Sequence, residues 1–340
     1  MKKLCLILGF CLILSGCASM GEPEKKQYTA TFLELFDTVT TIVGRAENQE
    51  EFQQVSQSIH DDLERYHQLF DIYHEYEGIN NLKTINDNAG LEPVQVDKAI
   101  IDLLQDCKQY YDLTGGKVNV AMGSILQLWH KARENALNDP ENARLPSQSD
   151  LQDAAAHISL DAVVIDEEAS TVFITDGFVQ LDVGAIAKGW ATERVARNAP
   201  RGLLISVGGN VCATGAKVEP NTPWVVGVQD PDGGEAYLHT LNITGGCVVT
   251  SGDYQRYFTV DGKIYHHIID PETLMPSAYW RSVTVVCADS GLADALSTAL
   301  FLLPLEEGKA ILQKNGAEAL WVASDGQKYY SDNFKTLIRT

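Results

Sequence analysis

The sequence has few cysteines, no long apolar run and no excess of basic residues, and each absence excludes a class of protein. Seven of the 340 residues are cysteines and none forms a C-x-x-C pair, which excludes the common zinc spacings. No apolar stretch approaches the ~20 residues that a membrane-spanning helix needs. Acidic residues outnumber basic ones by 46 to 26, so we expect no nucleic-acid partner. An anionic ligand must therefore be held locally, by a metal ion or by main-chain N–H groups.

The first residues are typical of a secretory signal. Lys2 and Lys3 precede an apolar run, Leu4 to Leu14, that is too short to cross a bilayer. The run ends in L-S-G-C (14–17), which resembles a bacterial lipobox. We therefore expect residues 1–16 to be a lipoprotein signal peptide and an acylated Cys17 to anchor an extracytoplasmic protein to the lipid of the cell membrane. The alternative is an ordinary signal with an incidental cysteine.

Residues 17–29 are small and polar, and we interpret them as a tether. The expected domain, 30–340, is one interwoven α+β unit in which helices pack on mixed sheets. Without Lys2 and Lys3 the chain has 24 basic and 46 acidic residues, a net charge of −22. Four cysteines lie in the domain: Cys107, Cys212, Cys247 and Cys287. The sequence does not say whether or how they pair, and buried free thiols are the simpler expectation.

Hydrophobic periodicity predicts the elements. Apolar residues recur at helical spacing from Asn48 to Leu69. Further helices are expected at 99–113, 126–136, 292–302 and 305–315, and a polar surface connection at 138–149. A strand is expected over Phe32–Val43. Short β-rich runs separated by Gly, Asp and Pro follow at 162–165, 171–174, 179–181, 203–207, 224–229, 237–243, 247–250, 257–260, 282–287 and 319–323.

One candidate metal site lies in the expected helix near residue 300. Asp294 and Thr298 are four residues apart and therefore share a helix face. A carboxylate beside a hydroxyl offers the hard oxygen ligands that Mg²⁺ prefers. The alternative is that Asp294 merely lies near the positive end of the helix dipole.

A second candidate is the turn L-D-V-G-A-I-A-K-G (181–189), which joins a strand to a helix. Its small residues allow a ligand close to the backbone, and free N–H groups at a helix start suit a phosphate. Asp182 can accept hydrogen bonds from a ring N–H, and Lys188 can meet a phosphate. The spacing is neither that of a P-loop nor G-x-G-x-x-G. The alternative is a tight connection capped by Asp182.

His266 and His267 precede Asp270-Pro271. His267 is a candidate general base, a phosphate contact or a structural hydrogen-bond donor. A metal site formed by His267 and Asp270 is less favoured, because no third ligand is near in sequence.

Together these segments resemble the ApbE family of FAD:protein FMN transferases. The resemblance spans roughly residues 30–335. The motifs that carry it are F-D-T (36–38), Tyr73, G-K-V-N-V-A-M-G (116–123), L-W-H (128–130), L-D-V-G-A-I-A-K-G-W-A (181–191), I-S-V-G-G-N (205–210), T-S-G-D-Y-Q-R-Y-F (250–258), H-H-I-I-D-P (266–271), S-V-T-V-V (282–286) and A-D-A-L-S-T-A-L-F (293–301). It implies the T-fold-like ApbE fold, with FAD in a groove between sheets.

The resemblance also implies the chemistry. Mg²⁺ assists the splitting of FAD at its pyrophosphate, FMN passes to a threonine or serine hydroxyl of a target flavoprotein, and AMP leaves. The acceptor would be a flavoprotein subunit of a membrane redox complex or a secreted FMN-binding domain. Metal ligands are implied at Asp294, Thr298 and the carbonyl of Ala185. The residues implied to line FAD are Phe36, Tyr73, Lys117, Val118, Asn119, Asp182, Lys188 and Ile269, with Tyr73 stacking on a ring. His267 and Asp182 are the catalytic candidates.

The chain departs from many relatives at four places, one of which is the loop D-P-E-T-L-M-P (270–276), which lacks the glycine often found there. It has Phe36-Asp37 where they have Met-Gly, Asn119 where they have Asp, and Ser297 where some carry a second Asp. Ser297 puts a third side-chain metal ligand in doubt. Three other functions stay open: a metal-dependent FAD pyrophosphatase, a non-catalytic flavin-binding lipoprotein, and a structural lipoprotein without ligand.

Overall fold

The computed structural model describes residues 25–218, 221–234 and 236–340. The expected signal peptide 1–16 and Cys17 lie outside the described residues. The first strand, β1, begins at Lys26, inside the range 17–29 that was expected to be a tether. No helix in the described part of the chain is both long and apolar enough to cross a membrane.

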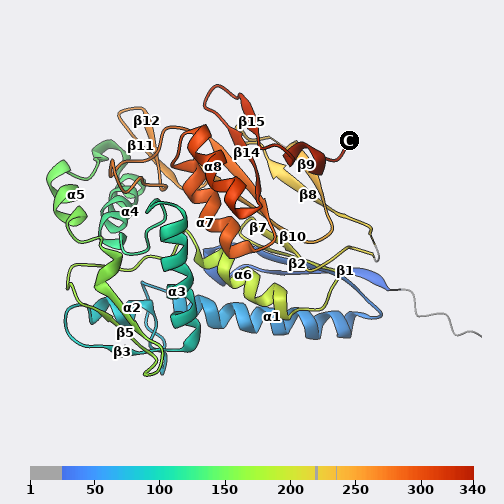
Figure 1. The fold of residues 1–340 in the computed structure, drawn as a ribbon, viewed down its shortest axis with the longest axis horizontal. Helices are drawn as coiled ribbons and strands as arrows, with labels where there is room; N and C mark the ends of the chain where they lie inside the picture. The colour runs from blue at the N-terminus through green and yellow to red at the C-terminus, as the bar shows by residue number, and fades with distance from the viewer. Residues whose placement is uncertain (1–24, 219–220, 235) are drawn as a thin grey trace, which may run out of the picture.

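The core of the molecule is an eight-stranded sheet in which all neighbouring strands run antiparallel (Figure 1). Its strands are, in spatial order, β1 (Lys26–Phe32), β2 (Thr40–Ala46), β6 (Leu203–Val207), β7 (Asn210–Ala213), β10 (Gly246–Gly252), β13 (Ser282–Cys287), β14 (Glu318–Val322) and β15 (Lys328–Tyr330). Alternate side chains of each strand point to opposite faces, and both faces are covered.

Four helices cover one face of this sheet: α1 (Gln49–Phe70), α6 (Ala187–Asn198), α7 (Ser290–Phe301) and α8 (Leu305–Asn315). α1 begins where the Asn48 side chain accepts a hydrogen bond from the Glu51 N–H, at 2.9 Å. Its apolar stripe, including Phe52, Ile59 and Leu63, packs with α6 against β2 and β6. The hairpin β8 (Trp224–Gln229) and β9 (Tyr237–Ile243) and the short helix α9 (Phe334–Leu337) cover the opposite face.

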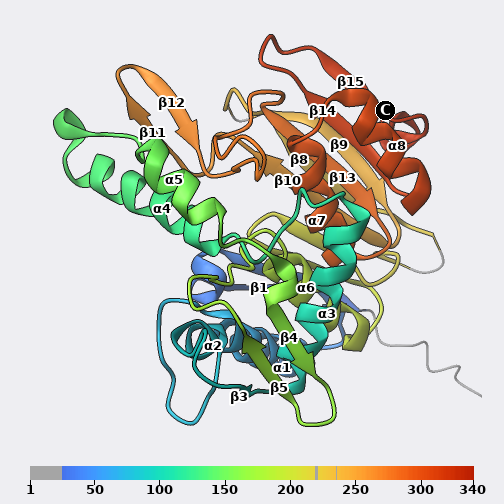
Figure 2. The same cartoon turned by 60° about the vertical axis from the view of Figure 1, so that its left-hand side comes forward.

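Two smaller units adjoin the sheet (Figure 2). One contains α2 (Leu82–Asp87), α3 (Lys98–Leu113) and a three-stranded sheet of β3 (Val94–Gln95), β5 (Thr171–Ile174) and β4 (Val163–Asp166). The other contains α4 (Gly123–Asn138), α5 (Gln148–Ala155) and the hairpin β11 (Tyr257–Val260) and β12 (Lys263–His266). Short 3-10 helices occur at Leu35–Asp37 (η1), Pro140–Asn142 (η2) and Leu160–Ala162 (η3). Segments distant in sequence thus share each unit, which confirms the expected α+β class.

Two expectations about local structure were wrong. The expected strand Phe32–Val43 is broken by η1, because Phe36 and Asp37 adopt left-handed backbone angles, φ 53° and 52°. Residues 179–181 join no strand and make only an isolated bridge from Gln180 to Met122. The expected polar connection 138–149 is mostly exposed, as predicted, and it also contains η2 and the start of α5.

Candidate functional site

The candidate site is built around a close contact between α6 and α7. The Asp294 carboxylate of α7 accepts a hydrogen bond from the Gly189 N–H in the first turn of α6, with 2.8 Å between N and Oδ2. A Cβ placed on Gly189 would lie 2.4 Å from Cβ of Asp294 and 2.4 Å from the Ser290 carbonyl oxygen. Only glycine permits this approach. The turn 181–189 and the segment 293–301 therefore meet in space, as the sequence predicted.

Asp294 and Thr298 both lie in α7, so the predicted helix and its shared face are confirmed. The Asp294 side chain is buried and that of Thr298 half-buried. Ala185 is half-buried in the turn that precedes α6. Ser297 does not add a ligand here, because its hydroxyl donates to the Asp294 carbonyl and bonds the Ser251 hydroxyl, at 3.0 and 2.8 Å.

The pKa of Asp294 depends on its burial and on the groups around its carboxylate. Burial raises the pKa of this carboxyl, whereas the Lys188 charge, the Gly189 N–H and the Asn210 amide lower it. The Asn210 amide faces the carboxylate, yet its buried Nδ2 makes no hydrogen bond of good geometry with a described residue. Oδ1 of Asp294 accepts no hydrogen bond from the described chain either. A buried carboxylate with a spare oxygen is suited to bind a cation, whereas the unsatisfied Asn210 N–H is a donor and is suited to an oxygen acceptor.

Asp182 both caps its own turn and joins it to a neighbouring segment. Its Oδ1 accepts a hydrogen bond from the Gly184 N–H, and its own N–H donates to the Val120 carbonyl, each at 2.8 Å. Burial raises the pKa of Asp182, opposed by the charges of His130, Arg256 and Lys188. The capping role is therefore observed, and the ligand-binding role stays a prediction.

The two adjacent histidines have different surroundings. His266 is buried, with Nε2 donating to the Ser277 carbonyl at 2.7 Å and Nδ1 accepting from the Ile268 N–H at 3.2 Å. This ring is structural. His267 lies at the surface, and its Nδ1 faces the Arg256 carbonyl at 3.3 Å. Because a carbonyl can only accept, Nδ1 carries the proton and Nε2 is a free acceptor.

His267 is neutral at physiological pH. Although its side chain is exposed, the surrounding protein partly desolvates the ring. This desolvation, followed by the charges of Arg256, His266 and Lys188, lowers the pKa of His267 to about 3. The ring can therefore accept a proton, but it is a weak base.

Two cations occupy the middle of this group. The Lys188 charge lowers the pKa of Asp182, His267 and Asp294. The Arg256 charge lowers the pKa of Asp182 and His267. Neither cation forms an ion pair with a described residue. In a chain with a net charge of −20, two cations without an ion-pair partner among the described residues, both near Asp182 and His267, favour the binding of an anion. Arg256 was missed by the sequence reasoning, although it lies in the motif 250–258 and differs in charge from its neighbours there.

Tyr73 offers an aromatic surface at the same place. One face of its ring stacks on His130, with centroids 5.6 Å apart, and the side chain is 54% exposed. Desolvation, then the charge of Asp182, raises the pKa of Tyr73 to about 12, which places the ring beside that carboxylate. His130 lies in the L-W-H motif but was assigned no role.

The segment 117–119 is held mainly by contacts within the protein. Lys117 pairs with Asp270 at 3.2 Å and Glu272 at 2.9 Å, so its charge is already balanced. Asn119 is buried, donates to the Ile158 carbonyl at 2.8 Å and accepts from the Ala121 N–H at 2.9 Å. The side chains of Val118 and Ile269 are buried in separate core clusters. Main-chain atoms of these residues remain candidates for FAD contacts.

Phe36 lies in the strained η1 turn. Its N–H donates to Nδ1 of His67 at 3.3 Å, and the two rings meet edge to face. The charge of Asp37, the next residue, contributes to the raised pKa of Tyr73, so this turn lies near the candidate site. Consecutive left-handed non-glycine residues cost ~1–3 kcal/mol each and tend to occur at functional sites.

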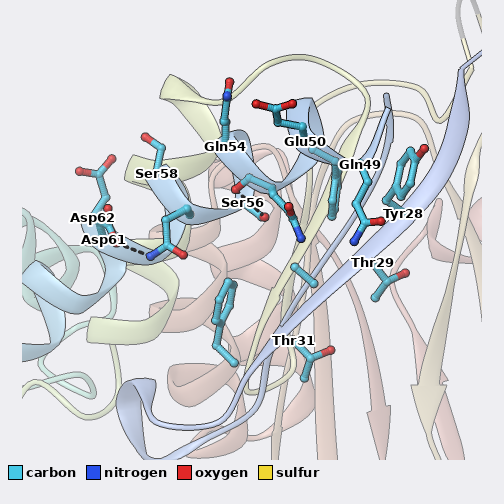
Figure 3. Close-up of a pocket in the computed structure, with 15 residues that line it drawn as sticks. Tyr28, Thr29, Thr31, Gln49, Glu50, Gln54, Ser56, Ser58, Asp61 and Asp62 are labelled. Carbon is cyan, nitrogen blue, oxygen red and sulfur yellow. Dashed lines mark hydrogen bonds between the residues drawn. The ribbon is translucent and has the colours of Figure 1, made fainter. Parts of the chain in front are cut away.

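A groove of about 910 Å³ lies between β1 and α1 (Figure 3). Its walls carry Tyr28, Thr29 and Thr31 on the strand and mostly polar side chains on the helix, including Gln54 and Asp61. None of the predicted site residues lines it. This groove is therefore separate from the candidate site.

Comparison with known proteins identifies the family. Residues 36–321 match the ApbE family. The chain is 32% identical over 272 residues to an FAD:protein FMN transferase of Klebsiella pneumoniae, with 77% of this chain and 82% of the relative covered. It is 33% identical over 263 residues to an FAD:protein FMN transferase of Treponema pallidum, with 72% and 71% covered.

Solved structures agree with this. The ApbE protein of Thermotoga maritima superposes with a TM-score of 0.82 at 31% identity, over 93% of this chain and 100% of that one. The flavin transferase ApbE of Vibrio cholerae superposes with a TM-score of 0.75 at 22% identity, over 92% and 100%, and supports the fold. The resemblance drawn from the motifs is thereby confirmed, and the chain belongs to the ApbE family.

Proposed function

We propose that this protein is a Mg²⁺-dependent FAD:protein FMN transferase that passes FMN to a threonine or serine hydroxyl of an acceptor flavoprotein and releases AMP. The relatives named as FAD:protein FMN transferases support the overall reaction. The observation that carries the metal-assisted mechanism is the 2.8 Å contact between the Asp294 carboxylate and the Gly189 N–H. It brings the proposed ligand Asp294 beside the turn that holds Ala185.

The donors at this place fit a hard divalent cation. A carboxylate, a hydroxyl and a main-chain carbonyl, from Asp294, Thr298 and Ala185, are all oxygen ligands, and phosphate oxygens and water complete such a set for Mg²⁺. A bound Mg²⁺ supplies neutralisation of the charge that develops on the diphosphate. The spare Oδ1 of Asp294 is consistent with this assignment.

The other residues bind and orient the reactants. Lys188 and Arg256 contact diphosphate oxygens, since both cations lack partners among the described residues. Tyr73 stacks its open face on a ring of FAD, supported from behind by His130. Main-chain N–H groups near the start of α6 add to the phosphate contacts.

The acceptor hydroxyl gives its proton to a nearby side chain. Nε2 of His267 is a free acceptor near both cations, and it takes the hydroxyl proton as the new P–O bond forms. Its low pKa suits a loose phosphoryl-transfer transition state, in which the proton leaves late. The P–O bond between the FMN phosphorus and the bridging oxygen breaks, this oxygen stays with AMP, and AMP is released.

The test is mass spectrometry of a threonine-bearing acceptor domain after incubation with the enzyme, FAD and Mg²⁺. We expect the acceptor to gain FMN less one water, with one AMP released per acceptor modified. Rapid AMP release without acceptor would instead identify an FAD pyrophosphatase. FAD that stays bound and intact would identify a flavin-binding protein without transferase activity.

We also propose that Cys17 is acylated and anchors the protein to the cell membrane on its extracytoplasmic side. The signal-like residues 2–14 and the L-S-G-C sequence support this.

A further inference from the structure

Three cysteines form a row across three neighbouring strands of the main sheet. β10 pairs antiparallel with both β7 and β13, and Cys247 of β10 lies directly opposite Cys212 of β7 and Cys287 of β13. Directly opposed residues in antiparallel strands point to the same face. Here that face is the one covered by the helices, because Cys212 and Cys247 pack in one core cluster with Val195 of α6.

Only one of the two opposed pairs brings thiols together. The Sγ atoms of Cys212 and Cys247 lie within 4.8 Å of each other, while the Cys247 thiol donates to Oε2 of Glu193 at 3.8 Å. The Cys287 thiol instead faces the N–H groups of Ala288 and Asp289, the two residues that follow its strand. Cys107 is buried in a different core cluster.

The backbone at this pair already suits a covalent link. Opposed residues of antiparallel strands have Cα atoms about 4.5 or 5.5 Å apart, and disulfides span about 4.4–6.8 Å. The Cα spacing of the pair therefore lies in the range of disulfides without a change of strand register. Glu193 also lies within 4.8 Å of both thiols. Its Oε2 accepts hydrogen bonds from the Cys247 thiol and the Ser290 N–H, at 3.8 and 2.7 Å, and its Oε1 accepts one from the Arg197 guanidinium at 2.6 Å.

We propose that Cys212 and Cys247 form a disulfide while the chain folds in an oxidising compartment, and that Cys107 and Cys287 remain thiols. The oxidant is a disulfide, either a small molecule such as oxidised glutathione or a thiol–disulfide oxidoreductase. One cysteine thiolate attacks it and releases the first reduced thiol. The second cysteine thiolate then displaces the second, so two electrons and two protons leave the protein.

The reaction belongs to folding because the finished structure protects both thiols. Cys212 and Cys247 are 4% and 0% exposed, so no oxidant reaches them in the closed sheet. The contact with Cys212, and then burial, raises the pKa of Cys247, so almost no thiolate forms in the folded protein.

The link would brace the strands beneath the candidate site. β7 begins at Asn210, which faces Asp294, and β10 carries Ser251, whose hydroxyl meets that of Ser297 in α7 at 2.8 Å. Closing the loop 212–247 removes freedom from the unfolded chain. We expect the melting temperature to rise by about 5 °C when the link is present.

The test is to fold the purified protein with oxidised and reduced glutathione, block free thiols, digest with trypsin and analyse the peptides by mass spectrometry. Each cysteine lies in its own tryptic peptide: 99–108, 202–217, 218–256 and 282–309. We expect 202–217 joined to 218–256 and the other two blocked. Cys107→Ser is the matched control and should keep both the link and the rise in melting temperature, whereas Cys212→Ser should lose both.

Three results would overturn the proposal. Folded protein with all four of these thiols blocked would exclude the disulfide. A link to peptide 282–309 or 99–108 would show that the pairing is wrong. Intact thiols that give a sulfur-to-metal absorption band on titration with Cd²⁺ would identify a soft-metal site at Glu193, Cys212 and Cys247 instead.

Discussion

Replacing Gly189 by alanine tests the contact on which the site depends. The added methyl carbon would lie 2.4 Å from both Cβ of Asp294 and the Ser290 carbonyl oxygen. Neither is the free end of a flexible side chain, so α6 and α7 must move apart. Overpacking of this kind costs about 1–3 kcal/mol, whereas alanine gains at most about 1 kcal/mol in helix propensity over glycine. We therefore expect a net loss of stability and a melting temperature lower by a few degrees.

The effect on activity should exceed the effect on stability. The Asp294 carboxylate must move relative to the turn at Ala185, and a displacement of about 1 Å can reduce the rate of an enzyme by about 100-fold. The assay is AMP release from FAD in the presence of an acceptor domain, below the melting temperature of the variant. FAD affinity, measured by quenching of flavin fluorescence, should change far less than kcat.

Gly308→Ala is the matched control. Gly308 also lies in a helix, α8, but the nearest atom to its added Cβ would be Cδ2 of Leu300 at 3.1 Å, the end of a side chain. This variant should be as active as the parent and no less stable. If Gly189→Ala behaves like Gly308→Ala in both assays, the close approach of α6 and α7 is refuted.

Three further predictions concern the cations, the base and the anchor. Arg256→Gln should weaken FAD binding about 10- to 100-fold and reduce its salt dependence, and Lys314→Gln, exposed on α8, should do neither. His267→Gln should lower kcat about 100-fold or more. Because the pKa of His267 is about 3, the ratio of parent to variant activity should stay constant from pH 8 to 5, and a ratio that falls toward one below pH 6.5 would contradict this pKa. Cys17→Ser should move the protein from the membrane fraction to the soluble fraction with full activity, and unchanged membrane association would exclude the anchor.

Helices were the most predictable part of the fold. α8 and the interior of α1, α3 and α7 follow from apolar residues at helical spacing, and the face shared by Asp294 and Thr298 follows from the same period. Strands of regular alternation, such as β6, β8, β9 and β13, were located to the residue. These elements depend on local patterns that the sequence displays directly.

Features that depend on distant contacts were harder to predict. The break at Phe36 and Asp37 arises because the turn packs against His67 of α1, 31 residues away. β7 was not predicted, because Asn210–Ala213 is stabilised by pairing with β6 and β10 rather than by its own pattern. Val179 and Leu181 are apolar and fully buried, so the sequence of 179–181 resembles that of a strand. No strand that the structure describes pairs with it, apart from the isolated bridge at Gln180.

The candidate site shows the same division. The motifs correctly indicated that the turn 181–189 and the helix carrying Asp294 belong together, but not that Gly189 is the contact between them. Arg256 was not recognised, because only the fold brings it near Lys188 and His267. Lys117 was expected to meet FAD, and its pairing with Asp270 and Glu272 depends on a loop 153 residues away.

The most direct test of the proposed mechanism is a Mn²⁺ titration followed by electron paramagnetic resonance in the presence of FAD. Mn²⁺ takes the same oxygen ligands as Mg²⁺ and reports binding without turnover. The parent protein should bind one Mn²⁺ per chain, and Asp294→Ala should bind FAD but lose the ion. Equal Mn²⁺ binding by parent and Asp294→Ala would show that the cation is held elsewhere and would contradict the proposal.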